Sequence, residues 1–349
     1  MKRKFTALLL AAVMVVSLSA CSSDSSASDT DTSAEASADS TDTSGDTAEA
    51  QTATETTYPE EDIEVIVPYK VGGTTDLAVR GVLDAVSEDI IDVSITVTNE
   101  EGGSGLIGTE DFLSRDADGY TLGLVNCDLV LNYVTGATEI NPSEDMIPLA
   151  AVEQDPYLLL ADADAVFGTT FEEFLTYAEE NPGELVVGVT GVGTIPNLLG
   201  TILSNAGLEI SVVPYDSAPD AIAGVLSGEA DICISAMAAA VGNIESGDLI
   251  ALAVTSSERS ELSPDVPTMA EVDDRFTDVN LLSWIMIALP AGSPDEAVTV
   301  LKEALSDAVA SEAYAETRES FYFEEITITP DELDSFILEQ AAYYETLTE

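Results

Sequence analysis

The chain has 349 residues, of which 66 are acidic and 10 are basic, and it contains no histidine. Its formal net charge of −56 excludes nucleic acid as a natural partner, because phosphate groups require a basic surface, and it disfavours adhesion to anionic lipid. The lack of histidine removes the commonest general base and metal ligand. So acidic a composition is suited to high salt, where counterions screen the repulsion between carboxylates.

The N-terminus has the pattern of an export signal. Lys2, Arg3 and Lys4 precede an apolar run over residues 5–16, and Leu-Ser-Ala then leads to Cys21. A basic segment, a short apolar segment and a small-residue cleavage site are typical of a signal peptide, and the run is too short to span a membrane comfortably. The cysteine predicts a lipoprotein signal over residues 1–20, with Cys21 lipidated. The alternative is an ordinary signal peptide and an incidental cysteine.

Residues 21–57 are predicted to be a flexible tether between the lipid and the folded body. They are mostly Ser, Thr, Asp, Ala and Glu, and they cannot bury enough apolar surface to offset the entropy of ordering. Removal of the signal also removes three positive charges, so the net charge becomes −59. The folded body is expected to begin at Tyr58 and is long enough for two domains.

Cys127 and Cys233 lie within apolar stretches of this body. An oxidising compartment would permit a disulfide between them, but we expect buried free thiols. Their spacing does not indicate a metal site.

The stretch 65–76, with the sequence VIVPYKVGGTTD, predicts a strand that leads into a tight turn. Residues 65–67 have the pattern of a short buried strand, and Pro68 ends it because proline has no N–H for the ladder. Gly72 and Gly73 tolerate positive φ and allow a ligand to come close to the backbone. The turn is therefore suited to holding a small ligand against the main chain.

A helix is expected to begin directly after this turn, with Thr74 or Thr75 as its capping residue. The N-terminus of a helix has unpaired N–H groups and the positive end of the helix dipole, so the whole unit predicts an anion site. The alternative is an ordinary strand-to-helix turn that carries two glycines.

Strands and helices are predicted to alternate along the rest of the chain. Further strands are expected at residues 93–99, 120–125, 149–152, 157–161, 185–189, 210–213, 232–235, 250–254 and 281–288. Helices are expected around 107–113, 222–226, 238–246, 294–310 and 311–319, and a last amphipathic helix is expected after Thr329. Strands that alternate with helices favour an α/β fold with a mainly parallel sheet.

A second turn suited to an anion lies near residue 190. A capping box of Thr170 and Glu173 opens a helix, the strand 185–189 follows, and residues 190–197 then read TGVGTIPN. Pro196 falls in the first turn of the next helix, where a missing N–H is tolerated. Two such turns are stronger evidence for an anion site than either turn alone.

Several spaced motifs together resemble one protein family. In chain order they are YPEEDIEVIVPYKVGGTTDLAVR, DGYTL, NPGELVVGVTGVGTIPNLL, VVPYDSAPDAIAGVLSGEADI, LIALAVTSSERSELSPDVPTMAEV, LLSWIMIALPAGSP and TPDELDSFI. From Tyr58 onward the chain resembles the substrate-binding proteins of tripartite tricarboxylate transporters, the Bug or TctC-type family, in a lipoprotein form.

The resemblance implies a type II periplasmic-binding-protein fold, in which two α/β domains enclose a ligand cleft. Domain 1 would comprise residues 58–157 and 257–349, and domain 2 would comprise residues 158–256. In the family, two loops hold the carboxylate of the ligand, largely through backbone N–H groups and bridging waters. By position these loops are residues 69–76 and 190–197 here. Ligands of open α/β sheets bind beyond the carboxyl ends of the strands, where both loops are expected.

Candidate ligand-binding residues lie in these two loops and at two further strand ends. They are Tyr69, Lys70, Gly72, Gly73, Thr74, Thr75, Asp76, Thr190, Gly191, Gly193, Thr194, Asn197, Tyr215, Asp216 and Ser235. Asp76 is expected to brace its loop rather than to touch an anion. For the last three residues the alternative is turn capping, and Asp216 in the cleft would favour a ligand with a hydroxyl or amino group.

Lys70 is one of the few basic residues of the chain. Its charge would offset the repulsion that so acidic a protein exerts on a carboxylate; the alternative is that it points to solvent. Trp284 matches the Ser-Trp pair of the family and is expected in the core or at the edge of the cleft.

The chain departs from the family pattern near residues 99–106. The family often has Arg-Pro after the asparagine and a second asparagine before Ile-Gly, where this chain has Glu100, Glu101 and Leu106. A polar contact of that second asparagine is lost, which leaves the identity of the ligand open.

The resemblance implies a tethered solute receptor at the outer face of the cytoplasmic membrane, or in the periplasm. It would bind a small carboxylate as a monomer, close by a hinge motion and deliver the ligand to the large and small membrane subunits of a transporter. No cofactor, metal or catalytic residue is predicted, because a catalytic triad lacks its histidine and the glycine turns lack the P-loop pair of lysine and hydroxyl. The alternative is a receptor that presents its ligand to a membrane signalling partner.

Overall fold

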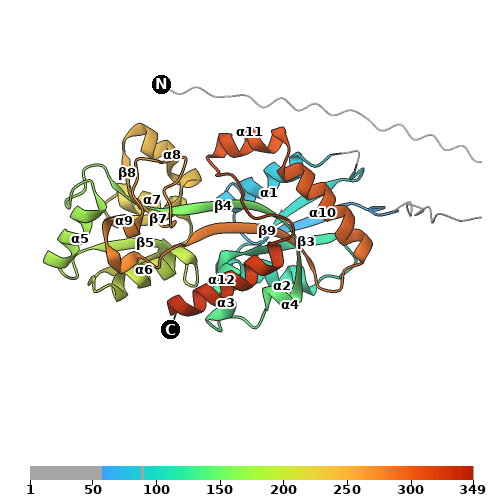
Figure 1. Ribbon diagram of the computed structural model, residues 1–349, viewed down its shortest axis with the longest axis horizontal. Coiled ribbons are helices and arrows are strands. Elements are labelled where there is room, and N and C mark those ends of the chain that lie inside the picture. The colour runs from blue at the N-terminus through green and yellow to red at the C-terminus, as the bar shows by residue number, and fades with distance from the viewer. Residues whose placement is uncertain (1–56, 88–89, 349) are drawn as a thin grey trace, which may run out of the picture. The chain divides into compact units, whose positions relative to one another are not determined.

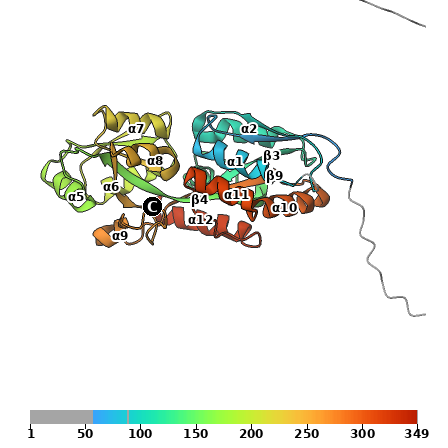
Figure 2. The same cartoon turned by 90° about the horizontal axis from the view of Figure 1, so that it is seen from above.

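The computed structural model describes residues 57–87 and 90–348, which Figures 1 and 2 show in colour. The predicted signal peptide, Cys21 and the predicted tether up to residue 56 lie outside the described residues. In the described part of the chain, no helix combines the length and the apolar character needed to cross a bilayer.

One parallel group of strands comes from the N-terminal part of the body. β1 (Ile63–Val67) pairs in parallel with β2 (Ile95–Asn99) and with β3 (Thr121–Asn126). α1 (Thr74–Asp84) and α2 (Leu106–Ser114) lie in the connections between these strands. Parallel neighbours need a crossover, and these helices provide it.

A second parallel group follows later in the chain. β5 (Val186–Thr190) pairs in parallel with β6 (Ser211–Tyr215) and with β7 (Ile232–Ala236). α6 (Ile195–Asn205) and α7 (Ala218–Leu226) form the two crossovers. Each crossover begins with one of the turns that leave the carboxyl end of a strand.

Two long strands join the groups. β4 (Met146–Asp162) pairs antiparallel with β9 (Leu282–Pro290) along its first part and with β7 and β8 (Leu249–Val254) along its last part. β9 also pairs with β3. The nine described strands form one sheet in the order β2-β1-β3-β9-β4-β7-β5-β6, with β8 beside β4. Figure 1 shows β4 in green and β9 in orange, side by side across the middle.

The predicted mainly parallel sheet is therefore correct for the two outer groups and wrong for the centre. The predicted strands 149–152 and 157–161 are parts of one strand, β4. Glu153, Gln154 and Asp155 suggest a break in the sequence, yet they pair with residues 283–285 of β9. The polarity of these three residues does not indicate that they pair with a strand more than a hundred residues further along the chain.

The remaining helices flank the sheet (Figures 1 and 2). They are α3 (Cys127–Val134), α4 (Pro142–Asp145), α5 (Phe171–Glu180), α8 (Met237–Ser246), α9 (Met269–Val272), α10 (Asp295–Val309), α11 (Glu312–Phe321) and α12 (Leu333–Thr348), with 3-10 turns at Gly103–Gly105 and Asp274–Phe276. The predicted last helix is confirmed as α12, which packs against α3 and buries Leu333, Ile337 and Tyr344.

Most of the short local motifs behave as predicted. Thr170 and Glu173 form the capping box of α5. Pro196 lies in the first turn of α6, as predicted, and Thr194 caps that helix, which was not predicted. Cys127 and Cys233 are buried free thiols, as predicted.

The cap predicted for the first loop is wrong. α1 begins at Thr74, its N-cap residue is Gly73, and no side chain caps it, so neither Thr74 nor Thr75 has that role. Of the two glycines, only Gly72 has a positive φ, of 77°. An uncapped helix start leaves its backbone donors available to other groups.

Gly123 in β3 gives room for Phe112 of α2, which is buried against the strand. A Cβ atom at Gly123 would lie 2.4 Å from the ring. We therefore expect Gly123→Ala to lower the free energy of unfolding by about 1–3 kcal/mol, as measured by chemical denaturation. The control is Gly242→Ala in α8, where nothing lies within 4 Å of the added carbon and stability should rise by up to about 1 kcal/mol. Equal effects of the two changes would contradict this packing argument.

Candidate ligand-binding site

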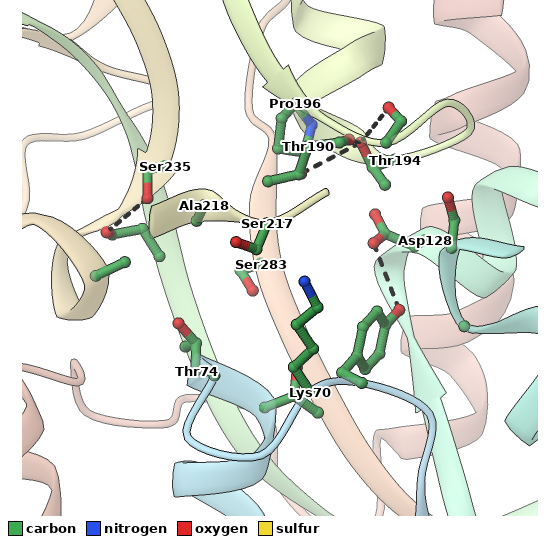
Figure 3. A pocket seen from close by; sticks show the side chains of 18 of the residues that line it. Lys70, Thr74, Asp128, Thr190, Thr194, Pro196, Ser217, Ala218, Ser235 and Ser283 are labelled. Carbon is green, nitrogen blue, oxygen red and sulfur yellow. Dashed lines mark hydrogen bonds between the residues drawn. The ribbon is translucent and has the colours of Figure 1, made fainter. Parts of the chain in front are cut away.

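A cavity of about 670 Å³ opens where the parallel strands of both groups end (Figure 3). Its lining includes Pro68 after β1, Asn126 at the end of β3, Thr190 at the end of β5, Tyr215 at the end of β6 and Ser235 in β7. The carboxyl ends of parallel strands are the usual ligand-binding edge of an α/β sheet. Here two such edges face one space.

Most of the predicted ligand-binding residues line this cavity. They are Tyr69, Lys70, Gly72, Gly73, Thr74, Thr75, Thr190, Gly191, Thr194, Tyr215, Asp216 and Ser235. The predicted residues outside the lining are Asp76, Gly193 and Asn197. Contact of any of these residues with a ligand stays a prediction.

Asp76 braces the first loop. Its buried carboxylate accepts hydrogen bonds from the N–H of Gly72 at 2.8 Å, from Arg80 Nε at 2.9 Å and from Asn99 Nδ2 at 2.8 Å. Burial by itself would raise the pKa of this carboxyl, but the bonds from Arg80, Gly72 and Asn99 together lower it. Asn99 Nδ2 also donates to the carbonyl of Tyr69, so the loop is tied down at both ends.

The first turn of α1 directs free backbone donors at the cavity. The first hydrogen bond of the helix runs from the N–H of Leu77 to the carbonyl of Gly73, at 3.0 Å. No residue of the loop 69–73, all of which is described, accepts a hydrogen bond from the N–H groups of Thr74, Thr75 or Asp76. Thr74 and Thr75 line the cavity. These donors and the positive end of the helix dipole are suited to an anion.

Lys70 is the one basic residue in the lining of the cavity. It forms no ion pair with any described acidic side chain. Figure 3 shows its side chain extended into the cavity, with the ammonium nitrogen between Thr74 and Asp128 in this view. Of the two interpretations of Lys70, the one that places its charge at the cleft is therefore favoured.

The start of α6 differs from that of α1, because the protein itself occupies its donors. The N–H of Ile195 donates to Asp128 Oδ1 at 2.9 Å, and the N–H of Asn197 donates to Thr194 Oγ1 at 3.3 Å. Pro196, between them, has no N–H. The first three residues of α6 therefore offer no free backbone donor, although the sequence of this turn predicts an anion site there. Of the second loop, Thr190, Gly191 and Thr194 still face the cavity.

Asp128 of α3 lies where the two loops meet. It lines the cavity, accepts the hydrogen bond from Ile195, and receives the hydroxyl of Tyr69 on Oδ2 at 3.5 Å. Burial raises the pKa of its carboxyl to about 6, against the hydrogen bonds from Ile195, Tyr69 and Cys127, which lower it. The carboxyl group is thus mostly ionised at neutral pH, and its ionisation costs free energy in the folded state.

The lining of the cavity includes a residue of the core. Trp284 of β9 is buried, lines the cavity and donates from Nε1 to Tyr344 Oη at 3.1 Å. It is therefore both a core residue and part of the cleft. Ser283 beside it donates to Glu153 Oε2 at 3.0 Å. Burial and the neighbouring carboxyl of Asp155 raise the pKa of Glu153 well above its usual value.

Several lining residues are not predicted from the sequence. They include Asn126, Cys127, Asp128, Ser104, Tyr157 and Ser283. The polar residues Asn126 and Asp128 directly follow a predicted strand, as the first loop does, and that position is the signal which could have identified them. Ser104 donates from Oγ to the carbonyl of Val192 at 2.8 Å, a contact that no local pattern reveals.

A mixed sheet with one cavity at the carboxyl ends of two parallel groups is the fold of the two-domain α/β periplasmic binding proteins. The model of the family described as the tripartite tricarboxylate transporter family receptor, TctC, matches residues 79–349. The chain belongs to this family, whose members are solute receptors. Among curated proteins, BugT of Bordetella pertussis strain Tohama I is 29% identical over 288 residues, which are 81% of this chain and 87% of BugT.

Solved structures agree with this assignment. The periplasmic binding protein BugD superposes with a TM-score of 0.73 and 25% identity over 83% of this chain and 97% of BugD. MatC from Rhodopseudomonas palustris, solved with bound malate, superposes with a TM-score of 0.75 and 23% identity over 84% of this chain and all of MatC. The second likeness supports the fold alone.

Removal of the Asp76 carboxylate should loosen the first loop. We expect Asp76→Ala to lower the free energy of unfolding by about 3 kcal/mol, because buried donors lose their acceptor. The control is Asp111→Ala, which breaks another Asp–Arg pair with the same spacing, but one in which both side chains are partly exposed. It should cost less than about 0.5 kcal/mol. Urea denaturation of both variants measures the difference, and similar losses would show that Asp76 has no special role.

The raised pKa of Asp128 predicts a pH-dependent change in stability. Ionisation of this carboxyl costs free energy in the folded state; the cost is absent below pH 3.8, grows as the pH rises to about 6 and is constant above that. Asp128→Asn stays neutral, so we expect its stability relative to the unchanged protein to increase by about 2 kcal/mol between pH 4.5 and pH 7.5. Calorimetry at the two pH values tests this. A stability difference that is independent of pH would argue against the raised pKa.

Proposed function

We propose that this protein is an extracytoplasmic solute receptor that binds a small carboxylate in the cavity and delivers it to the membrane subunits of a tripartite transporter. The observation that carries the proposal is the start of α1, where unpaired N–H groups and Lys70 face one cavity. A carboxylate taken out of water needs several charge-assisted hydrogen bonds, and these groups can provide them.

The family assignment supports a carboxylate. MatC was solved with bound malate, and another R. palustris protein with a TM-score of 0.74 was solved with adipate. Both proteins share the fold, and transfer of their ligand class to this chain is part of the proposal. The described body carries no catalytic role in this proposal, in which the bound acid leaves unchanged.

Closure of the cavity would couple binding to delivery. The proposed domains, residues 58–157 with 257–349 and residues 158–256, would rotate about the long strands β4 and β9. Hydrogen bonds already run between the two sets of residues, from Ser104 to Val192, from Asn132 Nδ2 to the Gly193 carbonyl at 2.9 Å and from Ile195 to Asp128. A ligand that contacts both loops would favour the closed arrangement.

The site of action follows from the N-terminus in this proposal. The signal over residues 1–20 would direct export, Cys21 would carry the lipid, and residues 21–57 would tether the body to the outer face of the cytoplasmic membrane. A lipid anchor of several acyl chains would hold the receptor near its transporter.

Ligand binding tests the proposal directly. A small carboxylate that binds only the folded protein must raise its melting temperature as the concentration exceeds Kd. We expect Lys70→Gln to weaken the binding of such an acid by about tenfold in calorimetric titration, because a charge-assisted hydrogen bond is lost. Lys302→Gln, on α10 and outside the lining, changes the net charge equally and should leave Kd unchanged. No binding by any carboxylate, or equal weakening by both changes, would contradict the proposed site.

A further inference from the structure

The two ends of the cavity differ in charge. At the start of α1 it presents free N–H groups and the ammonium of Lys70. At the start of α6 it presents the carboxylate of Asp128, which has already taken the one N–H donor that the first two residues of that helix possess. A ligand carboxylate therefore has a place at α1 and is displaced from α6 by a carboxylate of the protein.

Acidic groups outnumber basic ones around the whole cavity. The charged side chains in its lining are Glu101, Asp128, Asp216 and Lys70. A second or third carboxylate on the ligand would meet net negative charge without a second cation. An ammonium group on the ligand would be attracted by this net negative charge.

Asp128 has capacity to receive such a group. An ionised carboxylate has about four acceptor positions. Oδ1 receives the N–H of Ile195 and the thiol of Cys127, and Oδ2 receives only the long contact of 3.5 Å from Tyr69, so acceptor positions remain on a side chain that lines the cavity. The bond to Ile195 also fixes the orientation of the side chain, which prepares it for a ligand.

We propose that the receptor selects a zwitterionic ligand, a small amino acid, whose carboxylate is held at the start of α1 and whose ammonium group is held by Asp128. Asp128 is then the residue that determines specificity, and ligands with two or three carboxylates are disfavoured. The inference rests on the proposed function, because it assumes that the cavity binds a carboxylate at α1. Lys70 binds the carboxylate of the ligand both in the proposed function and in this inference.

Matched pairs of compounds test this inference in the unchanged protein. Calorimetric titration at pH 7.5 would compare β-alanine with propionate and succinate, γ-aminobutyrate with butyrate and glutarate, and L-alanine with propionate and L-lactate. We expect the best amino acid to bind at least about tenfold more tightly than its partners, because a ligand without an ammonium group makes no ion pair with the carboxylate of Asp128. Lactate separates recognition of a charge from recognition of any hydrogen-bond donor.

A variant of Asp128 tests whether this side chain causes the preference for the amino acid. Asp128→Asn keeps an oxygen for the N–H of Ile195 but loses the charge, and it should reduce the preference for the amino acid over its partner by about tenfold or more. Asp111→Asn removes the same charge on α2, outside the lining, and should keep the preference. Melting temperatures of both variants check that they are folded, and the measurements on the unchanged protein decide the question if Asp128→Asn does not fold.

Each result separates the two proposals. Tighter binding of the amino acid, lost in Asp128→Asn, supports the inference. Equal or tighter binding of succinate, glutarate, a simple acid or lactate overturns the inference and leaves the carboxylate receptor intact. A preference that Asp128→Asn retains also overturns the assigned role of Asp128. Absence of binding by every compound, acids and amino acids alike, removes the inference together with the proposed function.

Discussion

The antiparallel pairing of β4 with β9 is the constraint on which the rest of the structure depends. β4 pairs with β9 along residues 146–156 and then continues beside β7 and β8, while β9 also pairs with β3. One strand thus belongs to both parts of the sheet, and the carboxyl ends of the two parallel groups come to face one cavity. The same strand buries Glu153 and Asp155, and burial raises the pKa of both carboxyls.

The two helix starts at the cavity show how similar turns come to have different electrostatics. α1 has no side-chain cap, and its first N–H groups are unpaired with the preceding loop. α6 has a threonine cap, a proline and the carboxylate of Asp128, and these leave its first turn without a free donor. A helix dipole attracts an anion in either case, but in the second case the anion belongs to the protein. The cavity therefore has free hydrogen-bond donors at the start of α1 and a carboxylate at the start of α6.

Sequence patterns predict the elements well where the determining contacts are local. The capping box of Thr170 and Glu173 and the proline in the first turn of α6 involve neighbours within four residues, and both are present as predicted. The cap at Thr74 or Thr75 fails because the helix already begins at Thr74, so the N-cap position falls to Gly73, which has no side chain. The continuity of β4 is missed because its polar middle is stabilised by β9, which lies far along the chain.

The amino-acid sequence was enough to establish the α/β class, the family, the positions of both glycine turns and twelve of the residues that line the cavity. Periodicity, glycine and proline positions and capping residues act over a few residues, so they are readable in a linear chain. The tertiary structure alone decided that Asp128 meets the start of α6, that Lys70 extends into the cavity and that Ser104 bonds to the second loop. These contacts join residues that are brought together only when the strands pair, and no local pattern encodes which distant group will arrive.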